Sequence, residues 1–112
     1  MKLVNASKNL LLLSECWVMD NPLTRLAGLM GRRLEAGQGA LLLPCSSVHT
    51  FFMREPIDFL FLDREGRVLA SIEAFRTWGV PPFVRDTSMI AEGKAGSLAP
   101  FSELGDKIIV EP

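Results

Sequence analysis

The chain has 112 residues, of which 48% are hydrophobic and 22% are charged, and its formal net charge is −1. This balance predicts one domain over residues 1–112 and excludes intrinsic disorder, because enough apolar surface is present to offset the entropy lost on ordering. No basic run stands out along the chain, so we expect no nucleic-acid partner.

The first apolar run, at residues 10–13, is too short for a signal peptide and is followed directly by polar residues. No stretch of the sequence approaches the roughly 18 consecutive apolar residues that span a bilayer. We therefore expect a cytoplasmic protein without membrane insertion.

The N-terminal third is predicted to contain two strands and a helix. Residues 2–4 form the first strand, and the apolar residues 10–18 form a second strand that pairs back on it after a turn. Asn21 and Pro22 predict a helix start, since Asn caps a first turn and Pro fits the first helical position. An apolar stripe at helical spacing then predicts the one long helix of the chain, with Gly28 and Gly31 inside it: Leu23, Leu26, Met30 and Leu34.

The rest of the chain favours short strands, at residues 40–43, 48–53, 57–62, 67–75, 88–92 and 107–110. Residues 57–62 are apolar on both alternating faces except at Asp58, which predicts a central strand covered on both sides. About eight short strands with one main helix predict a mainly β fold, either a two-sheet sandwich or a barrel.

A polar cluster between residues 45 and 63 holds the candidate site residues His49, Arg54 and Asp58. Asp58 is the most informative of them, because a carboxylate among apolar neighbours must be paired, hydrogen-bonded or protonated. His49 and Arg54 are the nearby partners that we expect for it. Asp58 is therefore either a structural residue that fixes the turn around Pro56 or the polar centre of a ligand pocket.

The two cysteines leave several alternatives open. Cys45 and His49 would be about 13 Å apart on an extended strand, so they form a nucleophile–base pair only if the chain bends at Ser46 and Ser47. His49 is the single histidine, which excludes a multi-histidine metal site and leaves a packed, hydrogen-bonded imidazole as the alternative. Cys16 and Cys45 are either two reduced thiols or one bridge. We expect no metal and no cofactor.

A second candidate site is the loop that carries Trp78, Pro81, Pro82 and Phe83. Its prolines stiffen the backbone, so the aromatic side chains would lose little entropy on binding. The loop is either a binding surface or a lid that closes one end of the core.

Several segments carry a resemblance to a known family. The most specific is residues 49–58 (HTFFMREPID), and residues 28–32 (GLMGR) and 39–43 (GALLL) add to it. On these motifs the chain resembles the domain of unknown function 192 family, over about residues 20–110. The resemblance implies a two-sheet, jelly-roll-like β domain with one helix. It also marks Met53, Arg54, Pro56 and Asp58 as signature residues, and it implies no particular reaction.

Two functions of different classes remain open. The first is a non-enzymatic binding domain for a small molecule or a protein partner, which the polar cluster and the stiff aromatic loop support. The alternative is a hydrolase or transferase that uses His49, Arg54 and Asp58. It requires these three side chains to converge on one solvent-reachable pocket. An Asp58 sealed in the core on backbone N–H groups would deprive such an enzyme of its best residue.

Overall fold

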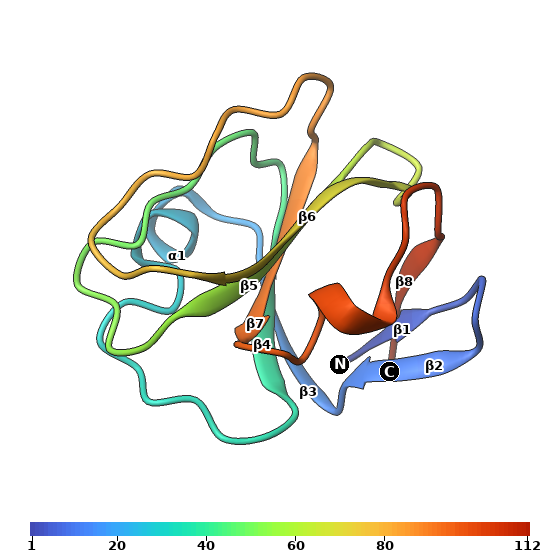
Figure 1. Cartoon of the computed structure of the whole chain (residues 1–112), viewed down its shortest axis with the longest axis horizontal. Coiled ribbons are helices and arrows are strands. Elements are labelled where there is room, and N and C mark those ends of the chain that lie inside the picture. The colour runs from blue at the N-terminus through green and yellow to red at the C-terminus, as the bar shows by residue number, and fades with distance from the viewer.

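The structure, a computed structural model, describes the backbone of residues 1–112 and every side chain except those of Leu26 and Ala27. Its regular secondary structure consists of eight strands, one short helix and one turn of 3-10 helix (Figure 1). In chain order the elements are β1 (Lys2–Asn5), β2 (Leu10–Leu13), β3 (Glu15–Met19), α1 (Pro22–Ala27), β4 (Gln38–Leu42), β5 (Ile57–Leu62), β6 (Val68–Phe75), β7 (Met89–Lys94), η1 (Ala99–Phe101) and β8 (Ile108–Glu111).

The strands form two sheets. The smaller has the order β2-β1-β8 and the larger has the order β3-β4-β7-β5-β6. Neighbouring strands are antiparallel, apart from the parallel pair of β3 and β4. The predicted mainly β, two-sheet architecture is confirmed, whereas the barrel alternative is wrong because the two sheets do not close on one another. The jelly-roll order implied by the family resemblance stays a prediction.

Each face of the larger sheet packs against a core of its own, because this sheet lies between the smaller sheet and the segment around α1 (Figure 1). The first core, between the two sheets, includes Leu3, Leu60 and Leu98. The second core, on the α1 side, includes Leu29 and Phe59. Strand β5 is buried at every position and sends alternate side chains into the two cores. The prediction of a central strand covered on both sides is therefore confirmed.

Most of the predicted strands are confirmed to within two residues at each end, but the one expected over residues 10–18 is divided. Strand β2 pairs with β1 as expected, and the chain then leaves that sheet at Ser14, so that β3 joins the other sheet beside β4. Leu13 on one side of the break and Cys16 on the other both reach the first core. The two polar residues of this stretch, Ser14 and Glu15, lie where the chain changes sheets.

The helix begins as predicted but is much shorter. The side chain of Asn21 accepts a hydrogen bond from the Thr24 N–H at 2.9 Å, and Pro22 occupies the first turn. The helix then ends at Ala27, because Gly28 and Gly31 take positive φ values of 50° and 70°, which favour glycine and interrupt a right-handed helix. The prediction that these glycines lie inside a long helix is wrong.

The apolar stripe expected on that helix is also only partly present. Leu23 is 79% exposed, whereas Leu34 is buried in the second core and Met30 packs against that core, although both lie beyond the helix end. Leu26, the remaining early member of the stripe, falls outside the described side chains. Among the residues described, no helix is long and apolar enough to cross a bilayer.

Residues 48–53, expected to form a strand, form turns around the buried Thr50 instead. The Thr50 N–H donates to the Gly79 carbonyl at 2.8 Å, and the Thr50 carbonyl accepts from Trp78 at 2.9 Å. The Thr50 hydroxyl oxygen also accepts from the Gly79 N–H at 2.8 Å. These bonds between two loops replace the ladder of a strand, and they fix the segment that carries most of the family signature.

Candidate functional site

Asp58 is fully buried, and its charge is satisfied by the backbone rather than by another side chain. Its two carboxylate oxygens accept hydrogen bonds of 2.8 to 3.0 Å from the N–H groups of Ala74, Gly96, Leu98 and Ala99. The expectation that His49 or Arg54 partners Asp58 is therefore wrong. The carboxylate instead anchors β6 and the turn before η1 to β5.

The structure does not bring His49, Arg54 and Asp58 together. Asp58 shares a face of β5 with Leu60, which belongs to the core between the sheets. Arg54 is exposed and donates from Nε to the Gly31 carbonyl at 2.8 Å. His49 is half-buried on the α1 side of the larger sheet, and its Nδ1 accepts from the Phe51 N–H at 3.1 Å. A reaction that needs all three groups at one reacting atom has no site here.

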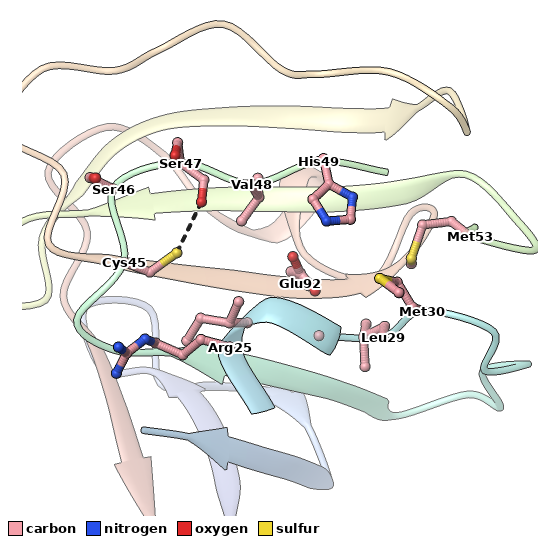
Figure 2. A pocket seen from close by; sticks show the side chains of 12 residues that line it. Arg25, Leu29, Met30, Cys45, Ser46, Ser47, Val48, His49, Met53 and Glu92 are labelled. Carbon is pink, nitrogen blue, oxygen red and sulfur yellow. Dashed lines mark hydrogen bonds between the residues drawn. The ribbon is translucent and has the colours of Figure 1, made fainter. Parts of the chain in front are cut away.

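The structure does contain a cavity of about 420 Å³, which lies over β7 between the end of α1 and the segment of residues 45–53 (Figure 2). One part of its wall is apolar and comes from Leu29, Met30, Leu42, Val48 and Met53. The other part is polar or titratable and comes from Arg25, Cys45, Ser46, Ser47, His49 and Glu92. A hollow that combines an apolar wall with polar groups is typical of small-molecule sites.

Glu92 lies at the base of this cavity, in the middle of the ring of side chains in Figure 2. Its side chain is on β7, the central strand of the larger sheet, and the residue is only 4% exposed. The carboxyl group has no hydrogen-bond or ion-pair partner among the described residues. The backbone of Gly28 lies close to the Glu92 carboxyl but offers no donor, because the Gly28 N–H already bonds to the Thr24 carbonyl at 2.8 Å. Burial raises the pKa of Glu92 to about 8.

Cys45 and His49 both line this cavity, but they do not form a nucleophile–base pair. The Cys45 thiol donates to the Ser47 carbonyl at 3.2 Å, and His49 Nδ1 is occupied by Phe51. Burial raises the pKa of the Cys45 thiol, so it stays protonated at neutral pH and is a poor nucleophile. Cys16 and Cys45 are both free thiols, which excludes the bridge between them. In the described part of the chain, no group of three His, Cys, Asp or Glu side chains is placed to hold a metal.

The aromatic loop lies beside the cavity rather than in it. Trp78 packs against Phe52, with ring centroids 4.7 Å apart, and against Phe51 at 6.1 Å. Phe51 in turn stacks on His49 at 5.0 Å, so Phe51, Phe52 and Trp78, which we call the aromatic platform, adjoin the cavity through His49. The remainder of the predicted binding loop is divided, with Pro82 and Phe83 exposed and Pro81 buried.

Sequence reasoning missed Glu92, although the signal that singled out Asp58 applies to it equally. Glu92 follows the apolar residues 89–91 and is the one charged side chain in the interior of that strand. An acid among apolar neighbours in a short strand is a candidate for burial, and the two acids differ only in what the fold places around them.

Comparisons with known proteins place the chain in a family. The family model DUF192, described as uncharacterized ACR, matches residues 3–109. UPF0127 protein PH1112 of Pyrococcus horikoshii is 34% identical over 114 residues, which cover 95% of this chain and 96% of that protein.

Two solved structures share the fold. A protein of unknown function from Novosphingobium aromaticivorans superposes with a TM-score of 0.80 at 19% identity, covering 97% of this chain and 82% of that one. A putative transcription regulator from Sinorhizobium meliloti superposes with a TM-score of 0.76 at 20% identity, covering 96% of this chain and 89% of that one. At this identity the likeness concerns the fold alone. The match to the family model and the identity to the Pyrococcus protein show that this chain belongs to the DUF192 family.

Proposed function

We propose that this chain is a non-enzymatic binding domain, spanning residues 1–112, that holds a small molecule in the cavity above Glu92. The observation that carries the proposal is the Glu92 carboxyl, which is buried, faces the cavity and lacks a partner in the described residues. A hydrogen bond contributes about 0.5–1.5 kcal/mol net, and about 1.5–3 kcal/mol when one of its groups is charged. A ligand that donates to the Glu92 carboxyl would gain this free energy as affinity.

Binding fits the cavity better than catalysis does. The groups that could act as nucleophile and base do not bond to each other, and the thiol is held in its unreactive form. The hydrolase or transferase alternative used Asp58, which bonds only to backbone N–H groups on the other side of the sheet. The cytoplasmic location expected from the sequence remains part of this proposal.

Methionine methyl groups offer a direct test of the proposed cavity. The chain has five methionines, of which Met30 and Met53 line the cavity, whereas Met1 is exposed and Met89 packs in the core on the opposite face of the larger sheet. In a protein labelled at the methionine methyl carbons, we expect fragment-sized ligands to shift the Met30 and Met53 signals and leave Met1 and Met89 in place. Met30→Leu and Met53→Leu variants assign the two signals.

A fragment screen in which no compound moves Met30 or Met53 in a saturable way would contradict the cavity proposal. Native mass spectrometry of freshly purified protein complements the screen, because a ligand carried through purification adds its mass to the chain. We expect Glu92→Gln to reduce the retention of such a ligand. Glu73→Gln, an exposed acid on β6, is the matched control and should leave it unchanged.

A protein partner that docks on the aromatic platform is the second candidate. Phe52 and Trp78 have φ values of 63° and 58°, which bulky residues rarely adopt, and they remain 60% and 58% exposed. The bonds around Thr50 thus hold two strained residues with their apolar rings in water, which is typical of interaction sites. Pro81, Pro82 and Phe83 would extend this surface.

Asparagine tolerates positive φ values, so the double variant Phe52→Asn, Trp78→Asn removes the rings without adding backbone strain. We expect it to fold as the parent does and to lose any partner that co-purifies with the parent as a defined complex. A partner retained by the double variant would exclude the platform as its docking site.

A further inference from the structure

We propose that the ligand of the cavity carries a protonated amino group, which pairs with the carboxylate of Glu92. This inference rests on the proposed function, since it names the class of small molecule that the same cavity accepts. It follows from which charges surround Glu92, which donors and acceptors line the walls, and how Figure 2 shows them to point.

The cationic side chains near Glu92 are directed elsewhere. Arg25, from α1, donates from Nη1 to the Asp20 carbonyl at 3.0 Å, and in Figure 2 its guanidinium points away from Glu92. Lys94 lies two residues further along β7, on the same face as Glu92, and its ammonium donates to the Leu34 carbonyl at 3.3 Å. Neither cation forms an ion pair with Glu92.

The remaining elements around Glu92 add no ion-pair partner among the described residues. The segment of residues 45–53 contributes Cys45, whose thiol is neutral, and His49, whose Nδ1 accepts a hydrogen bond from the Phe51 N–H. The cross-strand neighbours of Glu92 are Ala40 on β4 and Phe59 on β5. Desolvation alone accordingly raises the pKa of Glu92.

The surroundings disfavour an anionic ligand and suit a cationic one. A ligand carboxylate or phosphate would meet the acid of Glu92 without a cation directed into the cavity. An ammonium group instead forms a charge-assisted pair with Glu92, which lines the cavity. The apolar wall of Leu29 and Val48 suits an alkyl body behind the amino group.

Such binding releases a proton. With a pKa of about 8, the free Glu92 is mostly protonated at neutral pH, so an incoming ammonium displaces the carboxyl proton to solvent while keeping its own charge. The ionised fraction of a carboxyl with this pKa rises from ~3% at pH 6.5 to ~76% at pH 8.5. The affinity for an amine should therefore rise roughly 25-fold between these two pH values.

The test uses n-butylammonium, which stays charged at both pH values because alkylamines, like lysine, have a pKa of about 10.4. Its dissociation constant is measured from the Met30 and Met53 methyl shifts at pH 6.5 and pH 8.5. We expect roughly 25-fold tighter binding at pH 8.5. Two control probes are 1-butanol, which is equal in size and neutral, and butyrate, which is anionic. At pH 8.5 both should bind more weakly than n-butylammonium does. Glu92→Gln should abolish the pH dependence, whereas Glu73→Gln should keep it.

The possible negative results distinguish a wrong ligand class from a cavity that binds no small molecule. One outcome is that 1-butanol or butyrate shifts the Met30 and Met53 signals while n-butylammonium binds no better at pH 8.5 than at pH 6.5. The inference of an amine ligand is then wrong, but the proposal that the cavity binds a small molecule is retained. If the amine binds with the same pH dependence to Glu92→Gln, Glu92 is not its partner and the inference is overturned. If none of the three probes moves either methyl group, the amine inference falls, and the wider fragment screen decides whether the cavity falls with it.

Discussion

Glu92→Gln should make the stability of this protein less dependent on pH. The raised pKa of Glu92 means that the folded chain holds the carboxyl proton more tightly than the unfolded chain does. Its contribution is therefore fully present below the unfolded value of 4.5 and is lost as the pH rises towards about 8, where the carboxyl must ionise inside the protein. Glutamine has nearly the same shape and no proton to lose in this range.

The size of the effect follows from the same two values. One pKa unit corresponds to about 1.36 kcal/mol, so a rise from 4.5 to about 8 gives a ceiling of about 5 kcal/mol. Most of it, roughly 3–4 kcal/mol, falls between pH 5 and pH 8. No discount for solvent screening applies, since Glu92 is 4% exposed. A loss of this size is a large fraction of the stability of a domain.

The assay is urea denaturation of both proteins at pH 5, 6, 7 and 8. The free energy of unfolding of the parent should fall relative to that of Glu92→Gln by roughly 3–4 kcal/mol across this range. Taking the difference between the two proteins cancels the contributions of the other titratable groups. Two curves that run parallel from pH 5 to pH 8 would refute the burial of a partnerless acid, and with it the basis of the proposed function.

Three further substitutions test the surroundings of the site by urea denaturation. Asp58→Ala leaves four buried or partly buried N–H groups without an acceptor, so we expect a loss of at least ~4 kcal/mol or a chain that does not fold. Thr50→Val removes the hydroxyl that joins two loops and should cost ~1–3 kcal/mol, whereas Thr77→Val, the matched control, should stay within ~0.5 kcal/mol. Gly39→Ala introduces a Cβ that overlaps the backbone oxygen of Glu92 and a methyl group of Leu13, and should cost ~1–3 kcal/mol or more. Full stability of any of these three variants would contradict the contact assigned to it.

The predictions were correct for elements that are determined by neighbouring residues in the sequence. Asn21 and Pro22 fixed the helix start, and the two apolar faces of β5 fixed a covered central strand. The errors arose where an apolar pattern is shared by several conformations. Residues 48–53 alternate well enough for a strand, but the bonds between Thr50 and Gly79, 29 residues apart, impose turns on them. Tertiary hydrogen bonds of this kind leave no periodic trace in the sequence.

The site was predicted only in part, for a related reason. The sequence predicts that Asp58 needs a hydrogen-bond or ion-pair partner. Nothing in the local sequence shows that this partner is the backbone of Leu98, 40 residues away. Proximity in the sequence suggests Arg54 and His49 as partners of Asp58, because both lie within ten residues of it. His49 does line the cavity, and so does Met53, which the family motif singled out. Glu92, which lines the same cavity, lies 39 residues after Met53 and 43 after His49, and the pairing of β5 with β7 brings it close.

Asp58 and Glu92 lie on adjacent strands and face opposite cores, and their surroundings differ. Asp58 pairs across the ladder with Gly93, whose missing side chain lets Leu98 and its neighbours approach and donate their N–H groups. Glu92 pairs with Phe59 and Ala40, whose side chains offer no donor, and the Gly28 N–H above it is committed to the helix end. The fold encloses one acid completely and leaves the other facing a cavity, where the proposed ligand can reach the Glu92 carboxyl.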